Sequence, residues 1–435
     1  MLTIRNQPNH KQPHHFQPKI ISFFAGIVIS IYSFGASAVT EVVWWDFLGG
    51  GDGVRMKQMI DNFNEAHPDI NINATTLDWG VPFYTKVQTS AAVGEQPDIM
   101  TYHLSRFPLA VPTGVLRPIS AEELASVGIT ADRFFPANWE AANFGGATHG
   151  VPLDIHANVM YFNAEVLGEA GLLDENGHPT LLDGVDNFMN GLAKLDEIME
   201  FPIGFASDNG GMIWRWWYSI LNMMEGDFVE GSSICPGDKC EKSLQILIDL
   251  VEKGYMPSNV DYQSAKGMFI SGESAIHING VWEVPTMVDL MRNNELGFKF
   301  GVVDMPQVGP KMATWSDSHA FAIPHSDKNP ISDEKLEAVL KVMGWMSDNS
   351  LFWGTAGHIP ANTEVVDSVF YKNMQPNSTY ANIGENMVVD PFLPIAGVAS
   401  PTYDAFSNYI APAVNGELSA EEAIQMMRDD LESLM

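Results

Sequence analysis

The stretch Ser271-Gly-Glu-Ser-Ala-Ile-His-Ile-Asn-Gly-Val-Trp-Glu-Val-Pro285 joins a short apolar segment, a glycine and a tryptophan in direct succession. The apolar segment predicts a short strand that ends at Gly280. A glycine at the end of a strand lets the backbone and a neighbouring ring approach a ligand closely. The stretch therefore predicts that Trp282 lies at a binding surface.

The first part of the chain predicts the opening of an α/β unit. Thr40–Trp45 is rich in strand-forming residues and is followed by a glycine-rich loop at 46–53. Apolar residues then recur at helical spacing, at Met56, Met59, Ile60 and Phe63. Strand followed by loop and helix is the start of an α/β fold. The loop lacks the G-x-G-x-x-G order and the Gly-Lys-Ser/Thr ending, so it does not predict a nucleotide site.

Strand and helix patterns continue to alternate along the chain. Short strands are expected at 70–74 and from Pro97, and helical spacing recurs at 244–251, 336–343 and 424–431. Ser419 with Glu422 three residues later forms a capping-box pattern before the last helix. No repeat or linker divides the chain. These patterns predict the α/β class.

The N-terminus predicts export. Residues 1–19 contain basic and no acidic side chains, Ile20–Tyr32 is apolar, and Gly35-Ala36-Ser37-Ala38 has the small residues of a cleavage site. The apolar run is shorter than the roughly 20 residues that a membrane span needs. We expect a signal peptide at 1–38 and, because no cysteine lies near the cut, a periplasmic protein without a lipid anchor.

The charge balance excludes one large class of partner. The chain has 54 acidic against 23 basic residues and a formal net charge of −31 at pH 7. Such a field repels phosphate backbones, so no nucleic-acid binding is expected. Most of these charges are interpreted as surface residues that maintain solubility.

The chain contains two cysteines, Cys235 and Cys240, on either side of a Pro236-Gly237 turn. In an oxidising compartment, such a turn brings the two thiols together as a disulfide. A zinc finger or a Cys-x-x-Cys redox site would need other spacings or further ligands.

Five segments in order resemble the extracellular solute-binding proteins of carbohydrate ABC importers, the family 1 group that is similar to maltose-binding protein. They are Pro97–Met100, His149–Pro152 running to Met160–Asn163, Glu169–Leu172, Ser271–Trp282 and Gly357–Pro360. Thr180–Gly184 departs from the family pattern at a helix start. The resemblance implies an α/β fold of two lobes joined by crossing hinge strands, with a ligand in the interlobe cleft and closure on binding.

The resemblance also implies where the chain passes between the lobes. Crossings are expected near 151–157, 298–305 and 347–352. Lobe 1 would then comprise 39–152 and 303–347, and lobe 2 would comprise 153–302 and 348–435.

A neutral sugar presents apolar C–H faces and a rim of hydroxyl groups, so its site needs aromatic rings and fixed polar groups. The sequence offers such residues at the loops where the resemblance predicts the cleft. The candidate ligand-binding residues are Trp45, Asp46, Tyr102, Ser105, Arg106, His156, Trp214, Trp216, Trp282, His319 and Tyr403. Asp154 and Asp317 are weaker candidates.

Several candidates have a structural alternative. Trp44 and Trp45 alternate in direction on one strand, so one of them is expected in the core. The Trp214–Trp217 cluster is expected to present at least one ring to the cleft. His156 could be a satisfied interlobe histidine, and Arg106 could pair with an acidic residue.

The preferred hypothesis is the monomeric binding component of an ABC importer, which captures a mono- or oligosaccharide and delivers it to the permease subunits. It would need no cofactor and would not be an enzyme. One alternative is a secreted glycoside hydrolase, although no pair of carboxyls stands out as its catalytic pair. Another is a receptor for an amino acid, a polyamine or a metal. The scattered histidines predict no transition-metal cage.

Overall fold

The computed structural model describes residues 39–435. The predicted signal peptide at 1–38 lies outside the described residues. Within 39–435, no helix is long and apolar enough to cross a membrane.

The first sheet has the strand order β2-β1-β3-β14-β6. Its strands are β1 (Thr40–Asp46), β2 (Ile70–Thr76), β3 (Ile99–His103), β6 (Gly150–Pro152) and β14 (His319–Ala322). β1 runs parallel to both β2 and β3, while β14 is antiparallel to β3 and β6. The predicted first helix is confirmed as α1 (Gly50–Ala66), which buries Met56, Met59, Ile60 and Phe63.

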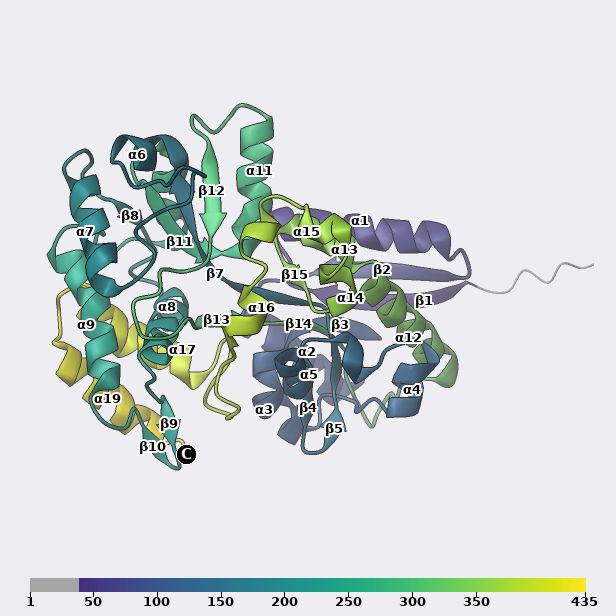
Figure 1. Cartoon of the computed structure of the whole chain (residues 1–435). Coiled ribbons are helices and arrows are strands. Elements are labelled where there is room, and N and C mark those ends of the chain that lie inside the picture. Colours follow the sequence, from purple (N-terminus) through teal and green to yellow (C-terminus); the bar gives the residue numbers. More distant parts are fainter. Residues whose placement is uncertain (1–38) are drawn as a thin grey trace, which may run out of the picture. The chain divides into compact units, whose positions relative to one another are not determined.

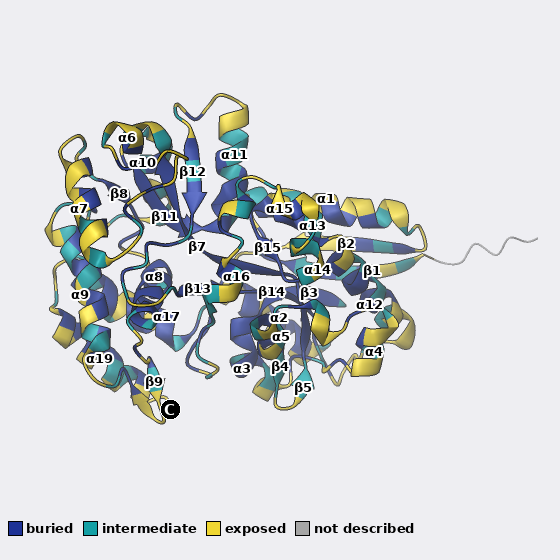
Figure 2. Cartoon of the chain, viewed as in Figure 1, coloured by how far each residue is buried: buried dark blue, intermediate teal, exposed yellow. Residues whose placement is uncertain are grey.

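The second sheet has the order β16-β13-β7-β11-β8, and β12 and β15 also pair with β7. Its strands are β7 (Asp154–Asn163), β8 (Ile203–Gly204), β11 (Ile276–Gly280), β12 (Phe300–Val303), β13 (Thr314–Asp317), β15 (Ile359–Pro360) and β16 (Met387–Val388). The strand predicted to end at Gly280 is therefore confirmed. Every residue of β7 is buried, because partners cover it along its whole length (Figure 2).

Helices pack around both sheets, with their exposed faces toward solvent (Figure 2). The longer ones are α1, α2 (Val81–Val93), α7 (Val185–Asp196), α8 (Gly210–Met223), α9 (Lys239–Glu252), α10 (Tyr262–Ser271), α11 (Val284–Arg292), α12 (Asp333–Asp348) and α19 (Ala420–Glu432). The predicted capping box is present at the start of α19, where the Ser419 hydroxyl accepts from the Glu422 amide.

The chain passes between the two sheets in two places that lie side by side (Figure 1). Leu153 alone separates β6 from β7, and Ser318 alone separates β13 from β14. The Leu153 amide donates to the His319 carbonyl at 2.7 Å, which ties the two passages together. The expected α/β fold of two lobes with crossing strands is thus confirmed.

The predicted disulfide between Cys235 and Cys240 is present. Cys235 precedes α9, and Cys240 lies in the first turn of that helix. The Trp217 indole donates to the Cys240 carbonyl at 3.2 Å. Arg428 of α19 donates to the carbonyls of Ile234 and Cys235 at 3.0 and 2.9 Å. The bridged turn therefore anchors the C-terminal helix.

Candidate functional site

A cavity of about 900 Å³ lies between segments of the two lobes. From the first lobe it is lined by the loop after β1, by residues 79–82 and by His103 and His319. From the second lobe it is lined by residues 208–212, Arg215, 262–263, Lys266, Trp282 and Tyr403, among others. Its size is in the range of small-molecule sites.

Four of the candidate residues line this cavity. They are His156, Trp282, His319 and Tyr403. His156 lies on β7, Trp282 lies in the short helical turn after β11, His319 lies on β14, and Tyr403 lies on α17 (Pro401–Ala405). The crossing strands therefore place residues that are distant in the sequence around one space.

Trp282 owes its position to the glycine before it. A Cβ atom at residue 280 would overlap the Trp282 ring, so only glycine leaves room for the ring against the end of β11. The Trp282 indole donates to the Tyr262 hydroxyl at 2.8 Å, and that hydroxyl donates to Glu283 at 2.7 Å. The absence of a side chain at Gly280 therefore makes room for the Trp282 ring, which remains partly exposed at the cavity wall.

Arg215 on α8 lines the cavity, although only its neighbours Trp214 and Trp216 were candidate ligand-binding residues. Its guanidinium lies 4.9 Å from the ring centroid of Trp282 and 4.6 Å from that of Trp315. Its Nε is 3.4 Å from the Tyr403 hydroxyl. The rings hold the planar cation in place while it lines the cavity.

The prediction for Trp214 and Trp216 is wrong in its geometry, because both rings lie in the core. Trp214 stacks on Tyr218 with centroids 4.6 Å apart and donates to Asp390 at 2.7 Å. Trp216 packs edge-on against Phe205. Successive residues on a helix point about 100° apart, so the face that presents Arg215 to the cavity directs its neighbours elsewhere.

Trp45 and Asp46 also lie outside the cavity. Trp44 is fully buried, and Trp45 is half-buried beneath the Lys86 ammonium group, 5.6 Å from the ring centroid. Asp46 accepts from the Leu48 amide at 3.0 Å, and burial raises the pKa of its carboxyl. The cavity is lined instead by the residues that follow, beginning with Phe47.

Tyr102 in β3 and the two candidates just after it are buried behind the cavity wall. Tyr102 packs edge-on against Tyr84, Ser105 donates to Asp317, and Arg106 donates to the Ala399 carbonyl at 2.9 Å. His103 reaches the cavity in place of Tyr102, because adjacent strand residues point to opposite sides. Asp317, a weaker candidate, accepts hydrogen bonds from the amide and hydroxyl of Ser105 and does not line the cavity.

Trp79 is a second cavity residue that sequence reasoning missed. Its side chain is 47% exposed, and it precedes Gly80, whose φ of 86° requires a residue without a side chain. The signal available in the sequence was a tryptophan directly before a glycine, in Asp78-Trp79-Gly80.

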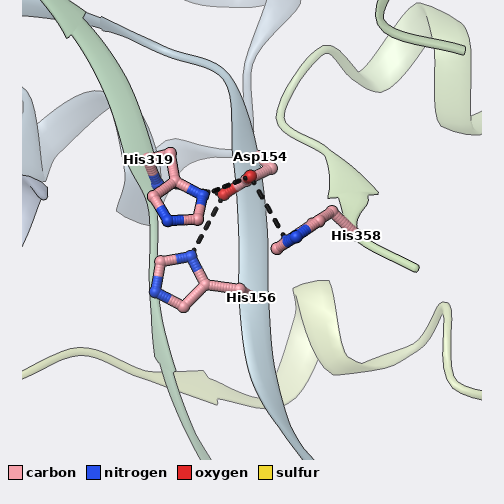
Figure 3. A group of neighbouring side chains, drawn as sticks. All are labelled: Asp154, His156, His319 and His358. Atoms are coloured by element: carbon pink, nitrogen blue, oxygen red, sulfur yellow. Dashed lines mark hydrogen bonds and ion pairs between the residues drawn. The ribbon is translucent and has the colours of Figure 1, made fainter. Parts of the chain in front are cut away.

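The histidines that seemed scattered in the sequence form a cluster around Asp154, which corrects that interpretation (Figure 3). Asp154 Oδ2 accepts from His319 Nδ1 at 2.8 Å and from the Trp353 indole at 2.7 Å. Its Oδ1 lies 3.2 Å from His156 Nδ1. His358 Nδ1 is 3.3 Å from Oδ2.

The cluster is buried, and both burial and the neighbouring charges shift the pKa values of its side chains. Burial alone raises the pKa of Asp154, but His319 and His358 outweigh it and hold that pKa well below its ordinary value. Burial lowers the pKa of His156 to about 3, so its imidazole is neutral at pH 7. Asp154 is therefore a carboxylate surrounded by imidazole nitrogens.

Residues 58–377 match the family model described as bacterial extracellular solute-binding protein, and the chain belongs to that family. The arabinooligosaccharide-binding protein of Bacillus subtilis (strain 168) is 22% identical over 370 residues, which cover 81% of this chain and 80% of the relative. The maltooligosaccharide ABC transporter solute-binding lipoprotein of Streptococcus pneumoniae (strain ATCC BAA-255 / R6) is 24% identical over 356 residues, covering 76% and 74%.

Among solved structures, the chain is similar in fold to the GacH receptor of Streptomyces glaucescens GLA.O. The two share 17% sequence identity with a TM-score of 0.77, and the match covers 91% of this chain and 98% of the receptor.

Proposed function

We propose that the protein binds a neutral sugar or oligosaccharide in the cavity between its lobes and delivers it to the permease of an ABC importer. The observation that carries this proposal is the arrangement of Trp282 and Tyr403 beside Arg215 at one cavity wall. The rings suit the C–H faces of a sugar, while the guanidinium supplies several donors for hydroxyl groups.

The cavity lining carries charges of both signs with carboxylates in excess, which disfavours an anionic ligand. Arg215 and Lys266 bring two cations, while Asp52, Asp208, Glu283 and Asp404 bring carboxylates. Hydroxyl groups both donate and accept, so a polyhydroxylated ligand can pair with both sets. The names of the relatives from Bacillus subtilis and Streptococcus pneumoniae point to the same ligand class.

The proposal includes a periplasmic monomer without a lipid anchor that carries out no chemical reaction. It also includes 39–152 in one lobe, whereas residues 303–317, expected there from the sequence, precede the passage at Ser318 and contain β13 of the second sheet. Membership of a solute-binding family supports binding over glycoside hydrolysis.

A thermal-unfolding screen of the purified protein tests the proposal. The panel contains monosaccharides, arabino- and maltooligosaccharides, and a polyamine as the non-sugar alternative. A saccharide at 100 times its dissociation constant is expected to stabilise the protein by about 2.7 kcal/mol. Stabilisation by the polyamine alone would overturn the proposal, and release of reducing sugar would show a hydrolase instead.

A further inference from the structure

We propose that Asp154, His156, His319 and His358 bind one zinc ion at the junction of the two lobes. Asp154 and His156 lie on β7, His319 lies on β14, and His358 directly precedes β15. All four are more than nine-tenths buried, and one potential ligand atom from each lies within 4.8 Å of the others.

The imidazole nitrogens of the three histidines face the carboxylate of Asp154 (Figure 3). The Nδ1 atoms of His156, His319 and His358 lie 3.2, 2.8 and 3.3 Å from the Asp154 carboxylate oxygens. Neighbouring ligands of a tetrahedral zinc ion with bonds of about 2.0 to 2.1 Å are about 3.3 Å apart. The distances to Asp154 are close to this value, while the four ligand atoms lie within 4.8 Å of one another, so binding would draw the histidines together and release the proton that His319 Nδ1 shares with Asp154.

His358 supplies the most specific indication of a cation. Its Nε2 lies 3.0 Å from Asp52 Oδ2, so a proton on Nε2 is shared with that carboxylate. Its Nδ1 is buried without a hydrogen-bond partner and faces Asp154 Oδ2 at 3.3 Å. A cation is favoured between these two buried atoms, and either a proton on Nδ1 or a metal ion can supply it.

The outer partners of the cluster also match those of a zinc site. Zinc-binding histidines commonly donate their other ring nitrogen to a carboxylate, as the contact between His358 and Asp52 provides. The Trp353 indole and the His319 amide donate to Asp154 at 2.7 and 2.9 Å, which fixes the orientation of its carboxylate. Three imidazoles with one carboxylate suit zinc, whereas calcium and magnesium prefer oxygen ligands.

The site would have a mechanical role distinct from ligand recognition. Its ligands come from β7 of the second sheet and β14 of the first, where the chain passes between the lobes. A bound ion would therefore hold the two crossing strands together beneath the cavity that His156 and His319 also line.

Calorimetric titration of the chelator-treated protein with zinc chloride tests the proposal, and it uses no saccharide. We expect one ion per chain, and we expect Co²⁺ in its place to give the intense visible bands of tetrahedral coordination. His358→Ala and His319→Ala should abolish tight binding. Asp52→Asn, which leaves all four ligands in place, should weaken it 10- to 100-fold.

His325→Ala is the matched control, because His325 forms an exposed pair with Asp327 at 3.1 Å. Its zinc affinity should equal that of the unaltered protein. Absence of tight one-to-one binding in the unaltered protein would overturn the proposal whatever the variants do, since it would leave a proton as the only cation between His358 and Asp154. Equal affinity in the His358→Ala variant would also overturn it.

Discussion

The guanidinium of Arg215 lies over the ring of Trp282, 4.9 Å from its centroid, and both groups line the cavity. The two side chains come from α8 and from the turn after β11, so the contact joins segments that are far apart in the sequence. It is the part of the site on which the first predictions depend.

Trp282→Ala should lower saccharide affinity at least tenfold, because it removes a ring that we propose to stack on the ligand. The measurement is calorimetric titration with the best saccharide from the screen. Phe370→Ala serves as the control, since that ring is 71% exposed and does not line the cavity. Unchanged affinity in the Trp282 variant would remove this ring from the binding site.

Arg215→Lys should weaken binding about tenfold while keeping the positive charge. Lysine lacks the planar group that lies against Trp282 and Trp315, and it lacks the fixed fork of donors. Calorimetric titration of both proteins with the best saccharide checks this, because a role of the charge alone predicts that the lysine variant binds as the unaltered protein does.

Gly280→Ala should reduce saccharide affinity to a similar extent as Trp282→Ala, because the added methyl group displaces the Trp282 ring. The same overlap should lower the free energy of unfolding by about 1 to 3 kcal/mol. Gly267→Ala is the matched control, since a methyl group there meets no atom within 4 Å and lies inside α10. That variant should bind normally and gain up to about 1 kcal/mol of stability.

Asp390 should make stability depend on pH. The indoles of Trp214 and Trp315 donate to its Oδ1 at 2.7 and 2.8 Å, and burial raises the pKa of its carboxyl to about 7 from 3.8. Between these values the folded state retains a proton that the unfolded state releases. The contribution to the free energy of unfolding is therefore full below pH 4 and is lost as the pH rises to 7, by at most about 1.4 kcal/mol per pH unit.

Chemical denaturation of the protein and of Asp390→Asn at several pH values measures this contribution. The stability of the unaltered protein relative to the variant should decline from pH 4 to 7 and stay constant above pH 8. The exposed Asp429→Asn variant should show no such difference in slope. Parallel curves for Asp390→Asn would contradict the prediction.

The fold could be predicted from the sequence because its signals are local. The strand before the glycine loop, the helical spacing from Met56 to Phe63 and the strand that ends at Gly280 each depend on a few consecutive residues. The disulfide could be predicted for the same reason, since its cysteines flank one turn. The lobe boundaries stay a prediction.

The site could be predicted only in part, because side-chain direction depends on the exact phase of each element. One position on α8 decides whether Trp214 or Arg215 reaches the cavity, and one position on β3 decides between Tyr102 and His103. An error of one residue does not prevent a sequence pattern from locating a helix or a strand. The same error assigns the wrong side chain to the binding site. The histidine cluster carried no clear local signal, because its members are brought together by the pairing of β7 with β13 and β15 and by the passage from β13 to β14.

Asp154 receives its hydrogen bonds from His319 and Trp353, which follow it by 165 and 199 residues. Contacts between such distant positions form slowly, because a long loop must close first. Until these contacts form, the Asp154 carboxylate stays exposed to water. The centre of the protein can therefore pack only after segments from the last third of the chain have folded against β7.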